Sequence, residues 1–188
     1  LHFRLEAAPG SRHTLEFVNL DNVWNGRPGS VAREFRTLVV SQDGREWSPV
    51  RPELLSTNRV RLTVQMPGPQ LYVARVEPYR LSDLDRLLAR LRASPLAAVE
   101  TIGRTVEGRE LELVRIGSER APFRVFLRAR AHPWETGGNW VLEGLFDRLL
   151  AGDDTARRLL SRYCVYALPL ANKDGVARGL TRFNLRGK

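Results

Sequence analysis

The sequence predicts two domains of different class: an all-β sandwich over residues 1–78, followed by an α/β domain with helices flanking a sheet over residues 79–188. Two observations predict this division. In the first part, apolar and polar residues alternate with a period of two, as they do in half-buried strands. Beyond Pro78, segments with the helical period alternate with apolar runs, which is typical of a sheet whose faces are covered by helices.

The first domain is expected to consist of short strands joined by turns. Apolar residues alternate with polar ones along 59–66, which predicts a strand with one buried face. Asp43-Gly44 separates two β-prone runs and predicts a hairpin turn. The stretches WNGRPGS (24–30) and MPGPQ (66–70) predict loops. Such a pattern, with almost no helical period, indicates a small antiparallel sandwich.

The second domain opens with a predicted helix over 81–95. Four leucines share one face of this helix: Leu84, Leu87, Leu88 and Leu91. Ser82 is the predicted N-cap, with Asp85 three residues later, and Pro95 ends the segment.

The remaining elements follow in the order expected for an α/β sheet. A hairpin turns near Glu107-Gly108, and in its second strand Leu111 and Leu113 alternate with glutamates. The later elements are a strand over 123–131, helices over 138–150 and 154–162, and a near-continuous apolar strand over 163–170.

Composition and charge limit the partners and the compartment. The net charge is +9, from 30 Lys+Arg against 21 Asp+Glu, but the basic residues are scattered, which favours acidic peptides over nucleic acid. No apolar run approaches the roughly 18 residues of a membrane span, so no membrane partner is expected. The first residues, LHFRLEAAPG, lack a signal-peptide pattern. The single cysteine, Cys164, is expected to be buried, and it fits a reducing, cytoplasmic compartment.

His132 and Glu135 form the candidate metal site. His132 ends an apolar strand, Pro133 interrupts the strand, and Glu135 falls in the turn before a helix. The carboxyl ends of strands in α/β sheets open onto crevices where ligands bind. An imidazole and a carboxylate there suit zinc, which in catalytic sites takes three protein ligands and a water. The alternative is a hydrogen-bonded surface histidine beside a carboxylate that stabilises the N-terminus of the helix.

The same H-x-x-E spacing occurs in His13 and Glu16. This pair lies in a predicted strand, where residues three apart point to opposite faces. We therefore expect His13 to be a strand-surface residue and not a metal ligand.

Two longer stretches carry a family resemblance: HPWETGGNWVLEGLFDRLL (132–150) and YCVYALPLANKDGVARGLTRFNLRGK (163–188). They resemble the zinc carboxypeptidase family, in particular its cytosolic carboxypeptidase-like branch. Residues 15–22 and 72–91 are similar to the small β domain and linker that precede the catalytic domain in this branch. The resemblance covers nearly the whole chain and implies that 79–188 is the first part of a carboxypeptidase-like α/β domain with a mixed sheet.

The resemblance implies roles for individual residues. His132 and Glu135 match the first two zinc ligands, and Asn172–Gly175 (NKDG) matches an N-P-D-G loop in which Lys173 replaces the proline. Arg182 matches the catalytic, substrate-binding arginine that polarises the scissile carbonyl and stabilises the oxyanion; the alternative is a solvated loop arginine. Trp134 departs from the arginine of the digestive branch and is expected to be an aromatic residue packed in a turn.

The activity implied by the resemblance is Zn²⁺-dependent hydrolysis of C-terminal residues of peptides or proteins, acidic residues among them. In the family, the third zinc ligand (a histidine) and the general-base glutamate lie beyond the position of Lys188. The 188 residues are therefore expected to be an amino-terminal part that by itself binds zinc weakly and hydrolyses nothing. The expected partners are a peptide or protein C-terminus and the remainder of the catalytic domain.

Two alternatives stay open at the level of sequence. One is a related zinc-dependent acyl or amide hydrolase on the same scaffold. The other is a non-catalytic binding module whose metal site has decayed.

Overall fold

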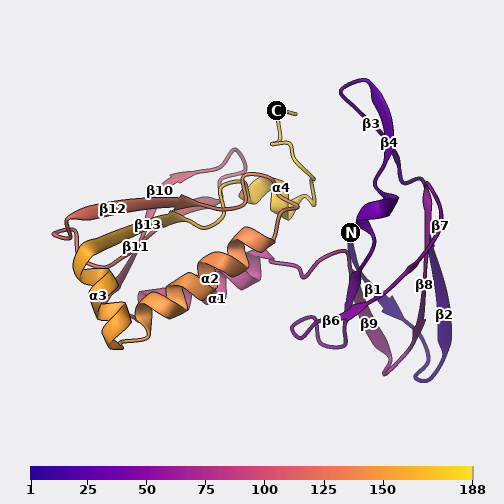
Figure 1. Cartoon of the computed structure of the whole chain (residues 1–188), viewed down its shortest axis with the longest axis horizontal. Coiled ribbons are helices and arrows are strands. Elements are labelled where there is room, and N and C mark those ends of the chain that lie inside the picture. The colour runs from indigo at the N-terminus through magenta and orange to yellow at the C-terminus, as the bar shows by residue number, and fades with distance from the viewer. Residues whose placement is uncertain (188) are drawn as a thin grey trace. The chain divides into compact units, whose positions relative to one another are not determined.

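The computed structural model describes residues 1–187, without the side chain of Trp24, and divides into two compact units, Leu1–Pro78 and Tyr79–Lys188 (Figure 1). The first unit contains antiparallel sheets, and the second contains a mixed sheet with helices. The expectation of a β sandwich followed by an α/β fold is therefore confirmed. Among the described residues, no helix is long and apolar enough to span a membrane.

The first unit is built from two main sheets and a hairpin. One sheet has the order β1 (His2–Glu6), β9 (Gln70–Ala74), β5 (Leu38–Ser41) and β6 (Ser48–Val50). The other has the order β2 (Arg12–Phe17), β8 (Arg59–Gln65) and β7 (Glu53–Ser56). The hairpin consists of β3 (Asp21–Trp24) and β4 (Arg27–Ser30), and a short 3-10 helix, η1, covers Ala32–Glu34.

A single hydrophobic core joins the two main sheets. The predicted alternation along β8 is observed, since Val60, Leu62 and Val64 are buried and the intervening residues are more exposed. They pack in one cluster with Leu38 of β5 and Val73 of β9. The burial of one face of each sheet against the other defines the sandwich.

Two turns of this unit bear on the predictions. Gly44 has φ +70° in the connection between β5 and β6, so the hairpin turn predicted at Asp43-Gly44 is confirmed. The stretch 24–30, expected to be a loop, instead contains β4 and the turn that joins it to β3. Asn25 and Gly26 both have positive φ (50° and 74°) and join the strands, as in the two-residue turns that favour Asn-Gly.

In the second unit, a mixed sheet has the order β10 (Ala97–Arg104), β11 (Glu110–Ile116), β13 (Tyr163–Leu168) and β12 (Phe123–Arg128). The strand β12 runs parallel to β13, and the other pairings are antiparallel. The helices are α1 (Leu81–Arg92), α2 (Gly137–Leu150), α3 (Asp154–Arg162) and the short α4 (Lys173–Ala177). The helices α1 and α2 lie side by side, since Arg90 of α1 pairs with Glu143 and Asp147 of α2, and they pack in one cluster with residues of the sheet (Figure 1).

The core of the second unit lies between this sheet face and the two long helices. The predicted leucine face of α1 is buried and packs in one cluster with Phe146 of α2, Val114 of β11 and Val165 of β13. The strand β13 is flanked on both sides, which explains its near-continuous apolar sequence. Cys164 in β13 is fully buried and carries a free thiol, as expected.

The cap of α1 differs from the prediction. The N-cap residue is Arg80 and not Ser82, because the helix begins at Leu81. The buried carboxylate of Asp83 accepts hydrogen bonds from the backbone N–H of Arg80 at 2.5 Å and from its Nε at 3.0 Å. The acid three residues after the cap therefore binds back to it, as in a capping box.

Candidate metal centre

His132 and Glu135 converge in the turn that follows β12. The backbone N–H of Glu135 donates to the carbonyl of His132 at 3.2 Å, which closes the turn. Their side chains meet as well, with His132 Nδ1 lying 2.8 Å from Glu135 Oε1. The side chains are 37% and 52% exposed, so both groups are accessible from solvent.

The pair fits two ligands of one zinc ion. Bonds of about 2.0–2.2 Å in tetrahedral geometry place two ligand atoms roughly 3.3 Å apart, so the observed 2.8 Å needs only a slight opening. Imidazole nitrogen and carboxylate oxygen are donors that zinc accepts. No group of three or more His, Cys, Asp or Glu residues within residues 1–187 is close enough to hold a metal. The described residues therefore offer two candidate ligands, fewer than the three protein ligands of a catalytic zinc site.

Pro133, between the two candidate ligands, packs against Gly175. A Cβ on Gly175 would lie 2.3 Å from Pro133 Cγ and 2.8 Å from Asn172 Oδ1, so only glycine fits this approach. The N–H of Trp134 donates to the carbonyl of Thr181 at 3.2 Å. Trp134 itself is half-buried, as expected of an aromatic residue packed in a turn.

Asn172, the first residue of the NKDG stretch, connects three segments around the candidate ligands. Its Oδ1 accepts from Gly175 N at 2.9 Å and caps α4, which makes part of the expected loop a short helix. Its Nδ2 donates to the carbonyls of Ala131, immediately before His132, at 3.4 Å and of Phe183, immediately after Arg182, at 3.3 Å. The sequence identified this motif but gave Asn172 no structural role.

Arg182 lines a cavity of about 470 Å³ in the second unit. Arg128 and Arg186 line the same cavity. The described lining includes Ala131, next to His132, but neither His132 nor Glu135. We call residues 132–135 the ligand turn. The two neighbours of Arg182 connect it to this region, since the carbonyl of Thr181 binds Trp134 and the carbonyl of Phe183 binds Asn172. The side chain of Arg182 lines a groove that neither candidate ligand lines.

The acid of the NKDG stretch, Asp174, has a structural role. Its carboxylate accepts from Thr105 Oγ1 at 2.7 Å, Arg109 Nη1 at 2.7 Å and Glu107 N at 3.1 Å. Burial alone would raise the pKa of Asp174, but the hydrogen bonds from Thr105 and Arg109 hold that pKa below its usual value. Asp174 therefore anchors the β10–β11 turn on α4.

Lys173, which stands at the proline position of the motif, forms a buried ion pair. Its Nζ lies 2.7 Å from Oε1 of Glu112 in β11. Both side chains are 8% exposed. Glu112 shares the buried face of β11 with Val114 and Ile116, whereas Leu111 is only partly buried.

Arg130 has a structural role that its sequence context does not indicate. It is buried, has φ +58°, and donates from Nε to the carbonyl of Pro133 at 2.7 Å. Burial lowers the pKa of Arg130 to about 10. Nothing in the stretch RARA distinguishes this residue from an ordinary strand arginine.

The side chains of His13 and Glu16, the second H-x-x-E pair, point to opposite faces of the strand, as predicted. In β2, Glu16 is exposed and binds Arg61, whereas His13 lies on the opposite, partly buried face. His13 Nε2 lies 2.8 Å from Ser11 Oγ. The expected surface position of His13 is therefore corrected to a half-buried one, because it shares its face with core residues.

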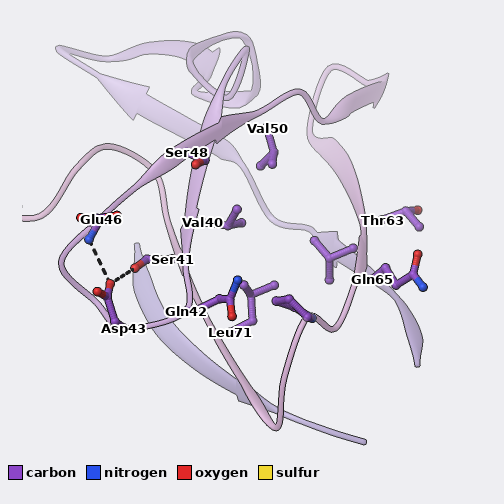
Figure 2. Close-up of a pocket in the computed structure, with 12 residues that line it drawn as sticks. Val40, Ser41, Gln42, Asp43, Glu46, Ser48, Val50, Thr63, Gln65 and Leu71 are labelled. Atoms are coloured by element: carbon purple, nitrogen blue, oxygen red, sulfur yellow. Dashed lines mark hydrogen bonds between the residues drawn. The ribbon is translucent and has the colours of Figure 1, made fainter. Parts of the chain in front are cut away.

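The first unit also contains a cavity, of about 490 Å³ (Figure 2). Its carboxylates are Asp43 and Glu46. Asp43 accepts from the N–H groups of Glu46 at 2.9 Å and Arg45 at 2.8 Å and from Ser41 Oγ at 2.9 Å, which lowers the pKa of Asp43 to about 2. These contacts hold the β5–β6 turn, and no histidine or cysteine is among the described residues that line the cavity.

Comparison with known proteins identifies the family. Residues 84–188, more than half of the chain, match the family model described as zinc carboxypeptidase. The chain therefore belongs to the zinc carboxypeptidase family.

Within the family, the chain is similar to cytosolic and bacterial carboxypeptidases. It is 30% identical over 139 residues to human cytosolic carboxypeptidase 2, which covers 67% of this chain and 15% of that protein. A metallo-carboxypeptidase from Burkholderia cenocepacia is 30% identical with a TM-score of 0.85. One from Pseudomonas aeruginosa, solved in complex with (2-guanidinoethylmercapto)succinic acid, is 29% identical with a TM-score of 0.87.

The two solved structures match the whole chain, and the chain spans 50% and 49% of their lengths. Its antiparallel β unit and mixed-sheet unit correspond in fold to that part of the bacterial enzymes.

Proposed function

We propose that the chain provides the metal-binding part of a zinc metallocarboxypeptidase that hydrolyses C-terminal residues of peptides or proteins. In this proposal, the β unit and the α/β unit are separate domains of a cytoplasmic enzyme. The observation that carries it is the 2.8 Å approach of His132 Nδ1 to Glu135 Oε1 in a member of the zinc carboxypeptidase family.

His132 and Glu135 would hold the zinc ion. When bound, zinc supplies Lewis-acid polarisation of the scissile carbonyl and activation of a water molecule. The third ligand, a histidine, and the general base, a glutamate, are proposed to come from parts of the catalytic domain outside the described residues. By this proposal, the 188 residues alone bind zinc weakly and are inactive.

Arg182 would act on the substrate. A guanidinium fixed beside the scissile carbonyl stabilises the negative charge that develops on its oxygen, an effect worth about 100-fold or more in rate. Its place in the groove next to Ala131, and the tie between Trp134 and Thr181, support this role.

The charge of the groove supports a preference for acidic C-terminal residues. Arg128, Arg182 and Arg186 contribute three positive charges, whereas the carboxylate of Asp174 in the same lining is already paired with Arg109. A carboxylate-bearing substrate is the ligand that such a groove favours.

The first test is metal binding by the full-length protein. His132→Ala and Glu135→Ala are each expected to weaken zinc binding by at least about 100-fold, because each removes a direct ligand. His13→Ala and Glu16→Ala are the matched controls, since they remove the same residue types at the same spacing and are expected to leave zinc affinity unchanged. Equal effects of both pairs, or wild-type protein without zinc affinity, would contradict the proposal.

The second test is substrate specificity. Peptides ending in glutamate are expected to be hydrolysed faster than neutral peptides and N-acyl amino acids, and Arg182→Gln is expected to lower kcat/KM by about 100-fold. Hydrolysis of acylated amino acids alone would indicate the related amide hydrolase. Zinc binding without hydrolysis of any of these substrates would indicate a binding module.

A further inference from the structure

Arg130 lies two residues before His132 in a conformation that is rare for residues with a side chain. Its φ of +58° lies in the left-handed region, which glycine adopts freely and other residues adopt only where their surroundings impose it. Its side chain is also buried, with 7% exposure for the residue. Both the burial of this cation and its backbone conformation are unfavourable by themselves, so the contacts of the side chain must compensate for them.

The guanidinium of Arg130 binds three neutral oxygens from three segments. Nε donates to the carbonyl of Pro133 at 2.7 Å, and Nη1 donates to the carbonyl of Tyr79 and to Oδ1 of Asn139, both at 3.0 Å. Asn139, in the first turn of α2, donates in turn to the carbonyl of Pro169 at 2.7 Å. The guanidinium therefore connects the ligand turn to the beginnings of α1 and α2 and to the end of β13.

The backbone of Arg130 adds a further connection, because its carbonyl accepts from the N–H of Asn172 at 3.1 Å. The ring of Pro133 rests on Gly175, as described above. Pro133, between the two candidate ligands, is thus held at its carbonyl by Arg130 and at its ring by Gly175 of α4. Held in this way, the turn carries His132 and Glu135 in the orientation that brings their side chains together.

We propose that Arg130 is a positioning residue of the metal centre: through the Pro133 carbonyl it fixes the turn that makes His132 and Glu135 converge. Arg130 touches neither ligand atom. The predicted effect on zinc affinity rests on the proposed function, but Arg130 holds the turn whether or not a metal is bound.

Arg130→Gly and Arg130→Lys in the full-length protein test the inference. Glycine suits the φ of +58°, so this variant removes the side chain without imposing backbone strain. Lysine keeps the charge but cannot reproduce the planar donor geometry. Asp153→Ala is the control, because it removes the N-cap of α3, which accepts from Ala156 N at 2.8 Å, and so destabilises the same unit away from the turn.

The first measurement is amide hydrogen exchange of the metal-free proteins. The N–H groups of Trp134 and Glu135, which are bonded to Thr181 and His132, are expected to exchange at least about tenfold faster in both Arg130 variants than in Asp153→Ala. Unchanged protection of these amides would overturn the inference.

The second measurement is zinc affinity by chelator competition, with the absorption spectrum of the cobalt-substituted protein as a report on coordination geometry. Both Arg130 variants are expected to bind zinc about 10- to 100-fold more weakly, and added guanidinium is expected to restore part of the affinity of Arg130→Gly. Wild-type affinity and spectrum in the Arg130 variants would also overturn the inference. Failure of the wild-type protein to bind zinc would refute the proposed function, and the exchange measurement would still decide the role of Arg130.

Discussion

Single residues around the ligand turn act mainly through the backbone. Gly175 allows α4 to approach Pro133, Asn172 binds the carbonyls on either side of the site, and Arg130 binds the carbonyl of Pro133. None of these contacts involves a candidate ligand atom. The geometry of the site therefore depends on residues whose own chemistry is unrelated to metal binding.

Gly175→Ala is expected to destabilise the protein by about 1–3 kcal/mol, the usual cost of overpacking. The added Cβ would lie 2.3 Å from Pro133 Cγ, so the ligand turn must shift, and zinc affinity is expected to fall as well. Urea unfolding and chelator competition measure the two effects.

Gly144→Ala in α2 is the matched control, because a Cβ at that position meets no atom within 4 Å. In a helix interior this change is expected to stabilise the protein by up to about 1 kcal/mol. If Gly175→Ala behaved like Gly144→Ala, the close approach would have no energetic consequence.

At this scale, the sequence predicts the candidate ligands but not their supports. His132 and Glu135 stand out because a histidine and an acid flank a strand-breaking proline. The burial of Glu112 could not be predicted, since its partner Lys173 lies 61 residues later in the sequence. The strand β11 is apolar on both faces, with Leu111 and Leu113 on one and Val114 and Ile116 on the other, so alternation alone does not decide which face is buried.

The elements around the site are joined through the turn between β10 and β11. In this turn, the side chains of Thr105 and Arg109 and the backbone N–H of Glu107 donate to the carboxylate of Asp174 in α4. The carboxylate of Glu107 also pairs with Arg178 at the C-terminus of that helix. A five-residue helix has little stability of its own. The hairpin therefore holds α4, and α4 in turn holds Pro133.

Asp174→Asn is expected to lower the free energy of unfolding at pH 7 by about 1–3 kcal/mol, because the amide NH₂ would face a donor. The folded-state pKa of Asp174 lies below its unfolded value, so the carboxylate stabilises the protein above the unfolded pKa. This contribution is lost as the pH falls through the lower, folded-state pKa.

Urea unfolding at several pH values below 7 measures this dependence. The difference between wild type and Asp174→Asn is expected to shrink as the pH falls below about 4. The exposed Asp85 on α1 provides the control variant Asp85→Asn. A difference that stayed constant down to pH 2 would show that the ionised carboxylate is not responsible.

Most elements follow from local periodicity. The leucine face of α1, the alternation of β8 and the continuous apolar run of β13 each reflect which faces are buried. Where the prediction was wrong, side chains decided the geometry: Asp83 moved the cap of α1 to Arg80, and Asn25-Gly26 formed a tight turn in a stretch expected to be a loop.

At the scale of the whole molecule, the two units have separate cores. The hydrophobic cluster of the β unit and that of the α/β unit share no residue. The sequence predicts the class of each sheet, but not which strands pair or in which register. Register depends on contacts between residues far apart in the sequence, such as those of β11 and β13.

Leu62→Ala is expected to destabilise the β unit by about 2–5 kcal/mol, since Leu62 is 2% exposed in its core. Hydrogen exchange is expected to accelerate in β2 and β8 and to stay unchanged in β11 and β13. Leu88→Ala in α1, which is also 2% exposed, should produce the reciprocal pattern. Faster exchange in both units from either change would indicate one cooperative unit.

The single cysteine provides a natural probe of how often the α/β unit opens. Cys164 lies in the central strand β13, opposite Arg124 of β12, and its side chain is inaccessible in the folded state. A thiol reagent added to the protein can react only after β13 has been uncovered, so the labelling rate measures how often this sheet opens. Ligands that tighten the unit would slow that rate, and the native chain needs no engineered probe to show it.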